Sequence, residues 1–124
     1  MEPVRILIVD DEEPICRLTQ AVLKKKGYEV EYSLDGIGGI QLVKTFNPHI
    51  VILDIIMPSG SGIDVLREML AVNPDIKAVM MSGLHDLGVA REAIRLGAKE
   101  YFVKPINFEM LLAMMAKLAP DQTA

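Results

Sequence analysis

The sequence has no tryptophan and a single cysteine, Cys16, among its 124 residues. One cysteine cannot form an internal disulfide, and because Cys16 falls in a predicted helix we expect a small buried hydrophobic residue there. Long apolar runs are also missing, since none approaches the roughly 18–20 residues that span a bilayer. The first residues lack the charged and then apolar layout of a signal peptide. These absences predict a cytoplasmic protein with no membrane segment.

Positive charge is scarce. Thirteen lysines and arginines face 17 acids, which gives a net charge of −4, and residues 24–26 are the longest basic stretch. We therefore expect no direct binding of nucleic acid. Half of the chain is apolar, enough for one sizeable core. We predict a single domain over residues 1–120 and a frayed tail over residues 121–124.

The most informative stretch is a continuous apolar run, Ile50 to Leu53, that ends on Asp54. Asn47 and Pro48 precede the run, and Pro58 follows it. Such a run predicts a strand buried on both faces of a sheet. A carboxylate at the tip of a buried strand costs free energy unless a partner compensates for it.

Strand and helix patterns alternate five times along the chain. We predict strands at 4–9, 28–33, 50–53, 76–81 and 100–103, and helices at 13–26, 37–46, 63–72, 86–96 and 107–118. This alternation indicates an α/β fold with a doubly wound parallel sheet, and the length favours the flavodoxin-like (βα)5 order 2-1-3-4-5. We expect residues 57–62 to form a loop. Gly38 and Gly39 should weaken their helix by about 1 kcal/mol each.

Polar residues follow the predicted strands at one edge of this sheet. Asp10 and Asp11 follow the first strand, Asp54 the third, Ser82 the fourth and Lys104 the fifth. The first and third strands are neighbours in the predicted order, about 4.8 Å apart. Three carboxylates in one cleft raise one another's pKa unless a cation joins them, and oxygen ligands of this kind suit Mg²⁺.

A phosphoryl group could enter a cleft of this composition, because Mg²⁺ and Lys104 would offset its charge. Asp54 would be the nucleophile, and Ser82 would donate a hydrogen bond to the transferring oxygens. Each residue also has an ordinary structural explanation. Asp10 and Glu13 have the spacing of a helix capping box. Ser82 and Gly83 could form an ordinary turn, and Lys104 could simply mark the end of a strand. Their joint placement at one edge favours the site.

These motifs resemble the receiver domain of two-component response regulators, over residues 4–118. They are Val-Asp-Asp-Glu at 9–12, Leu-Asp-Ile-Ile-Met-Pro at 53–58 with glycine at 62, Ser-Gly at 82–83 and Tyr-Phe-Val-Lys-Pro at 101–105. The resemblance implies that the protein is a phosphorylation-dependent switch in a phosphorelay and not an enzyme that turns over a substrate. A histidine kinase or a phosphotransfer protein would donate the phosphoryl group. The resemblance further implies that loss of the group by autodephosphorylation is slow.

The resemblance also assigns roles to single residues. Asp54 would accept the phosphoryl group, and Asp11, Asp54 and the backbone carbonyl of Ile56 would bind Mg²⁺. Asp10 would bind the ion largely through water. Ser82 and Tyr101 would form the switch, with Ser82 and Lys104 stabilising the phosphoryl oxygens. The Lys104–Pro105 bond is expected to be cis, which costs little before proline.

Three departures from the family pattern have consequences. Gly60 stands where a bulky apolar residue is common, so we expect a looser loop after Asp54. The glycine pair at 38 and 39 is a second departure. Ile56 and Leu84 are the third: in the family that this chain resembles, these two positions flank the path of the attacking water. Because both are apolar here, we expect them to slow loss of the phosphoryl group.

The last predicted helix suggests an interaction surface. Phe108, Leu111, Leu112 and Met115 form its core-facing stripe, whereas Met110 and Met114 lie off that stripe. Exposed methionines suit an adaptable binding surface. We therefore expect partners, or a second copy in a homodimer, on the face made by the fourth helix, fifth strand and fifth helix.

The same residues bear on three other functions. A haloacid-dehalogenase-like phosphatase needs a second acid two residues after its nucleophile, where this chain has Ile56. A flavin mononucleotide carrier needs a phosphate loop after the first strand, where the acids at 10–13 would repel phosphate. A phosphorylation-silent scaffold stays open. His49 and His85 are too isolated to predict a metal site, although His85 follows Ser82 closely and is a candidate for tuning the pocket.

Overall fold

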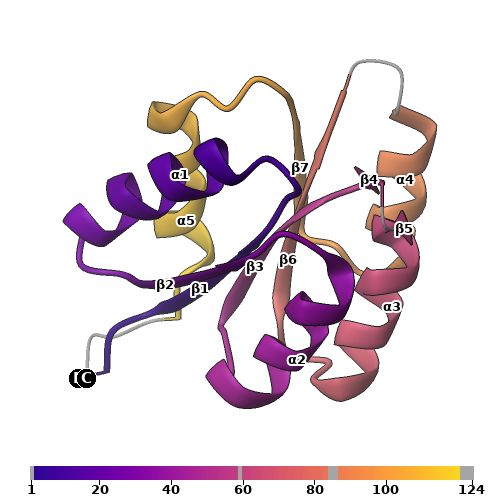
Figure 1. Ribbon diagram of the computed structural model, residues 1–124, viewed down its shortest axis with the longest axis horizontal. Helices are drawn as coiled ribbons and strands as arrows, with labels where there is room; N and C mark the ends of the chain where they lie inside the picture. Colours follow the sequence, from indigo (N-terminus) through magenta and orange to yellow (C-terminus); the bar gives the residue numbers. More distant parts are fainter. Residues whose placement is uncertain (1, 59, 84–86, 121–124) are drawn as a thin grey trace.

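The structure, a computed structural model, describes residues 2–58, 60–83 and 87–120. Five parallel strands form one sheet in the order β2-β1-β3-β6-β7, which confirms the predicted order 2-1-3-4-5 (Figure 1). These strands are β1 Arg5–Val9, β2 Glu29–Ser33, β3 Ile50–Asp54, β6 Lys77–Ser82 and β7 Glu100–Val103. Leu84, His85 and the predicted tail at 121–124 lie outside the described residues.

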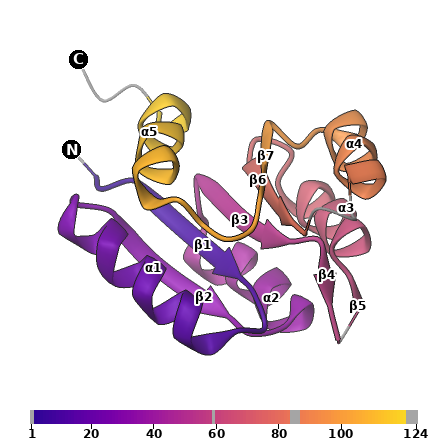
Figure 2. The same ribbon diagram turned by 90° about the horizontal axis from the view of Figure 1, so that it is seen from above.

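Helices cover both faces of the sheet (Figure 2). The helices are α1 Glu13–Lys25, α2 Gly36–Phe46, α3 Gly62–Val72, α4 Leu87–Leu96 and α5 Phe108–Leu118. One apolar cluster lies under α1 and α5 and includes Leu23 and Leu111. A second cluster lies under α2, α3 and α4 and includes Val43 and Leu66. Across the described ranges, every helix is too short or too polar to traverse a bilayer.

The start of α1 differs in detail from the prediction. Pro14 stands in the first turn and Lys24 and Lys25 in the last, as the sequence indicated. The N-cap is Glu12, and its side chain makes no capping hydrogen bond. The capping box that the spacing of Asp10 and Glu13 offered as an alternative explanation is therefore not formed. Asp10 instead accepts a hydrogen bond at Oδ1 from the backbone N–H of Glu12, at 3.0 Å.

The segment after β3 is more ordered than the predicted loop. Strands β4 Ile56–Met57 and β5 Gly60–Ser61 pair as a short antiparallel hairpin. Gly60 has φ of 149°, which glycine adopts without strain. Two-residue strands are too short to show hydrophobic alternation, so the sequence pattern did not reveal them.

Gly39 has a packing role in α2 that its low helix propensity hides. A Cβ atom there would lie 2.8 Å from Cγ2 of Val9 on β1 and 3.1 Å from Cε of Met69 on α3. A side chain at position 39 would therefore push α2 away from the sheet. The glycine allows α2 to pack closely at the end of β1, next to the polar edge.

Candidate functional site

Three carboxylates meet at the carboxyl edge of the sheet. Asp10 and Asp11 directly follow β1, and Asp54 ends the neighbouring strand β3. One carboxylate oxygen from each residue lies within 4.8 Å of the others. The predicted convergence of these acids is therefore confirmed. Asp10 and Asp54 are buried, whereas Asp11 is exposed to solvent.

Backbone amides orient the two buried carboxylates. Oδ1 of Asp10 accepts a hydrogen bond from Glu12 N–H, and Oδ1 of Asp54 accepts one from Ile56 N–H at 3.2 Å. Both amides lie two residues after the acid, so the loops that leave β1 and β3 fix the carboxylates in the same way. The second oxygen of each carboxylate is left for other partners.

Lys104 supplies the positive charge between these acids. Its Nζ lies 2.8 Å from Oδ2 of Asp54, 3.3 Å from Oδ2 of Asp10 and 3.2 Å from Oε1 of Glu12. The sequence placed Lys104 beside the aspartates correctly. It did not single out Glu12, although an acid two residues after Asp10 in the same loop was a usable signal.

The charges of this cluster depend on one another. Burial raises the pKa of the Asp10 carboxyl, and the Asp54 charge acts in the same direction, whereas the Glu12 amide and Lys104 oppose both. Burial alone would lower the pKa of the Lys104 ammonium. The hydrogen bond to Asp54 and the charges of Asp54 and Asp10 outweigh burial, so the pKa of Lys104 is raised. Lys104 therefore stays cationic at neutral pH.

The carboxylates fit a magnesium ion. Oxygens that share an octahedral Mg²⁺ at about 2.1 Å are at most about 4.2 Å apart, and oxygens that all lie within 4.8 Å of one another need at most a small inward shift to meet that limit. Oδ2 of Asp10 is buried, and apart from the ion pair with Lys104 at 3.3 Å it has no hydrogen-bond partner in the described chain. Such an oxygen is suited to a metal or a metal-bound water. The acidic triad is thus consistent with the Mg²⁺ site of a receiver domain.

Ser82 completes the edge at the end of β6. Its side chain is buried, and Oγ has no hydrogen-bond partner among the residues that the structure describes. The Ser82 carbonyl accepts a hydrogen bond from Lys104 N–H at 2.8 Å, so the ends of β6 and β7 are tied together. The Lys104–Pro105 peptide bond is cis. Tyr101, on β7, is 40% exposed.

The other candidate residues lie elsewhere or have structural roles. Cys16 is fully buried, as predicted, and its thiol donates to the Asp10 carbonyl at 3.3 Å. Burial raises the pKa of this thiol to about 12. His49 precedes β3, at the opposite edge of the sheet from Asp54, and its Nδ1 accepts a hydrogen bond from Arg5 N–H at 3.0 Å.

Comparison with known proteins agrees with this geometry. Residues 6–116 match the family model of the response regulator receiver domain. The chain is 34% identical to the chemotaxis protein CheY of Treponema pallidum over 119 residues, which cover 94% of this chain and 83% of that protein. It is 32% identical to the response regulator MprA of Mycobacterium sp. strain KMS over 124 residues. This alignment covers 97% of this chain but only 54% of the length of MprA.

Solved structures show the same fold. A CheY-like response regulator receiver domain protein from Methanospirillum hungatei JF-1 superposes with a TM-score of 0.87, at 30% identity and with 94% of both chains covered. Response regulators take part in phosphorelays with a kinase partner. This chain belongs to the response regulator receiver domain family, whose members are phosphorylation-dependent switches of two-component signalling and not turnover enzymes.

Proposed function

We propose that Asp54 accepts a phosphoryl group from a histidine kinase or a histidine phosphotransfer protein. The observation that carries this proposal is the contact of 2.8 Å between Oδ2 of Asp54 and Nζ of Lys104 at the open edge of the sheet. A buried carboxylate can act as the nucleophile, and a fixed cation beside it compensates the negative charge of the incoming phosphoryl group.

The transfer balances as a simple displacement. An Asp54 carboxylate oxygen forms a bond to phosphorus while the phosphorus–nitrogen bond of the donor histidine breaks. The electron pair leaves with the imidazole nitrogen, and the product on this chain is an aspartyl phosphate. Lys104 stabilises the phosphoryl oxygens by its charge, and Ser82 Oγ donates a hydrogen bond to one of them.

Asp10, Asp11, Asp54 and the backbone carbonyl of Ile56 would hold Mg²⁺, with Asp10 acting largely through water. When bound, the ion neutralises carboxylate charge and stabilises the transferring oxygens. The exposed Asp11 keeps the site open to water, which Mg²⁺ retains in its coordination sphere.

The switch would use Ser82 and Tyr101. The buried Oγ of Ser82 has no partner among the described groups, so a phosphoryl oxygen on Asp54 would be a new acceptor for it. Movement of Ser82 toward this acceptor would make room for the Tyr101 ring, which is 40% exposed in the present structure. A few kcal/mol of differential contact shift such a two-state element. Unchanged NMR rotamer populations of Tyr101 after phosphorylation would contradict this step.

The switch would change the face formed by α4, β7 and α5. Met110 is 43% exposed on this face. The sequence predicted that Met114 is also exposed, and this is wrong. The Met114 side chain is partly buried against the cluster under α5. The proposed docking residue for a partner or second copy is therefore Met110.

Two apolar residues, Ile56 and Leu84, would lengthen the life of the phosphorylated state. Ile56 is 55% exposed beside the acceptor, and Leu84 is the second residue of this proposal, although it lies outside the described residues. A polar side chain could orient the attacking water, which an apolar one cannot. Autodephosphorylation should therefore be faster in Leu84→Asn than in the wild type. An equal rate would remove the hypothesis.

Intact-mass measurement tests the proposed function. The chain is incubated with Mg²⁺ and acetyl phosphate, a small phosphoryl donor. We expect the addition of one phosphoryl group in the wild type and none in Asp54→Ala. An unchanged mass in the wild type would favour a phosphorylation-silent scaffold, and steady release of inorganic phosphate at enzyme-like rates would favour a phosphatase.

A further inference from the structure

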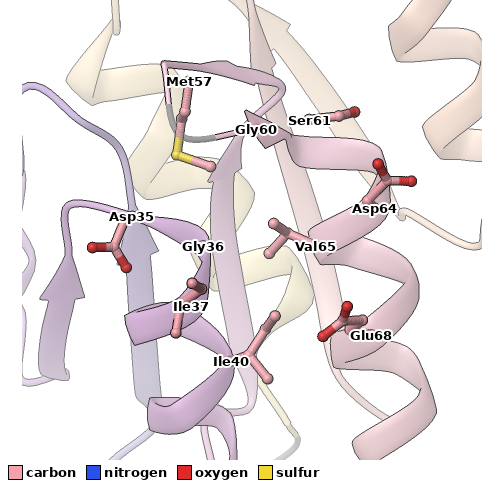
Figure 3. A pocket seen from close by; sticks show the side chains of 10 residues that line it. All are labelled: Asp35, Gly36, Ile37, Ile40, Met57, Gly60, Ser61, Asp64, Val65 and Glu68. Atoms are coloured by element: carbon pink, nitrogen blue, oxygen red, sulfur yellow. The ribbon is translucent and has the colours of Figure 1, made fainter.

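A second concave surface lies beside the acidic edge, between α2, α3 and the β4–β5 hairpin. It is a cavity of about 330 Å³, within the usual range for ligand pockets. Figure 3 shows Ile40 from α2, Val65 from α3 and Met57 from β4 pointing into the space between these elements. We call this surface the α2–α3 groove. Its floor is apolar, and it belongs to neither the phosphoryl site nor the α4–β7–α5 face.

An unusually exposed apolar residue stands at the rim of the groove. Ile37, on the first turn of α2, is 78% exposed, more than any other large apolar residue of the described chain. Isolated exposed apolar side chains are common, but here Ile37 continues the apolar floor formed by Ile40 and Val65. The floor and rim together form a surface that a partner's apolar side chains would cover.

The charged residues that line the groove are all acidic. They are Asp35, Asp64 and Glu68, and none of the residues lining this groove in the described chain is basic. Glu68 points into the groove, whereas Asp64 points away from it (Figure 3). Arg67 pairs with Asp64 at 3.7 Å, but both side chains are largely exposed, so water and salt screen this pair.

The two helix ends at the groove do not reverse this charge. Oδ1 of Asp35 accepts from Gly38 N–H at 2.7 Å, and Oγ of Ser61 accepts from Ile63 N–H at 3.2 Å. These side chains satisfy amides at the starts of α2 and α3 that would otherwise attract an anion. The Asp35 carboxylate also lines the groove, next to Gly36. The groove therefore favours a cationic occupant.

We propose that the α2–α3 groove binds a basic amphipathic segment of a partner protein. Apolar side chains of that segment would lie on Ile37, Ile40 and Val65, and a lysine or arginine would lie beside Glu68. An apolar floor with complementary charge at its rim is the arrangement by which grooves bind amphipathic helices. The proposal does not depend on phosphorylation of Asp54, so the two ideas succeed or fail separately.

NMR titration of the intact, unphosphorylated chain tests this binding. The probe is a synthetic, end-blocked peptide with lysine and leucine pairs at helical spacing. Two control peptides replace every leucine by serine or every lysine by glutamate. We expect saturable shifts of the backbone amides of Gly36, Ser61 and Val65 with the first peptide. Both controls should bind more weakly by roughly tenfold or more, since each lacks one of the two complementary features.

Matched variants locate the site. Glu68→Lys and Ile37→Ser change exposed side chains, and each should weaken binding of the probe peptide by roughly three- to tenfold. Glu31→Lys is the control, because it makes the same change of charge on the edge strand β2, away from the groove. It should change the affinity for the probe peptide by less than roughly twofold. Shifts scattered over the chain, equal binding of either control peptide, or equal weakening by Glu31→Lys would overturn the proposal. So would concentration-dependent sedimentation that shows a second copy occupying the groove.

Discussion

Nζ of Lys104 lies 2.8 Å from Oδ2 of Asp54, across 50 residues of sequence. Lys104 follows the edge strand β7, Asp54 ends the strand β3, and β6 lies between them. The lysine side chain thus crosses the end of β6 to reach the carboxylates. This contact places a permanent cation where a phosphoryl group would gain negative charge.

Removal of that cation should destabilise the metal-free protein. In Lys104→Met, buried Asp10 and Asp54 lose their compensating charge, and the free energy of unfolding at pH 7 should fall by roughly 1–3 kcal/mol. Lys117→Met removes a more exposed lysine, paired with Glu100 at 2.6 Å, and should cost less than about 1 kcal/mol. Urea unfolding of both variants measures the difference. Equal losses would show that burial of the acids does not govern the effect.

Magnesium should stabilise the folded chain through Asp11. At 100 times the dissociation constant, binding raises the free energy of unfolding by about 2.7 kcal/mol. Asp11→Ala alters an exposed side chain and should remove most of this response, whereas Asp75→Ala, which alters an exposed acid before β6, should retain it. Thermal unfolding with Mg²⁺ or with a chelator gives the comparison. A full magnesium response in Asp11→Ala would exclude that residue as a ligand.

The stability should also depend on pH through His49. Burial lowers the pKa of this imidazole below 6.5, and the charges of Arg5 and Lys77 act in the same direction while Glu2 opposes them. The unfolded chain therefore binds a proton more readily. The stabilisation is present above pH of about 6.5 and is lost as the pH falls through the folded pKa.

His49→Gln isolates this dependence, because it cannot be protonated in this range. Urea unfolding between pH 7.5 and 5.5 should show a smaller loss of stability in the variant than in the wild type, with the sign fixed by the lowered pKa. Parallel pH profiles for the two proteins would contradict the prediction.

Two glycines in helices should respond oppositely to alanine. Gly39→Ala improves helix propensity but brings Cβ to 2.8 Å from Val9 Cγ2, so we expect a net loss of about 1–2 kcal/mol. A Cβ atom at Gly88, in α4, would meet no atom within 4 Å among the described residues beyond its own helical neighbours, and Gly88→Ala should gain up to about 1 kcal/mol. Unfolding free energies of the two variants decide. A gain in both would mean that the α2 contact relaxes without cost.

Much of this structure follows from the sequence because apolar periodicity and strand ends are local signals. The buried runs at β1 and β3 each lead into acids, and parallel pairing then brings Asp10, Asp11 and Asp54 together. Lys104 joins them because β7 ends at the same edge.

Other features depend on contacts that the sequence does not encode locally. The β4–β5 hairpin is too short for a periodic pattern, and the close approach at Gly39 depends on how tightly α2 packs on β1. The pairing of Glu12 with Lys104 depends on which way two flexible side chains turn. The sequence predicts an exposed Met114, but its side chain packs against the apolar cluster under α5, and this contact depends on how the helix sits on the sheet.

Chemical location of the phosphoryl group tests most directly whether Asp54 is the phosphoryl acceptor. The chain is treated with acetyl phosphate and Mg²⁺, reduced with borohydride and analysed by peptide mass spectrometry. Reduction converts an aspartyl phosphate to homoserine. We expect homoserine at position 54 and at no other aspartate, with none formed when Mg²⁺ is removed. Homoserine at position 10 or 11, or its absence from position 54 in a chain whose intact mass shows phosphorylation, would contradict it.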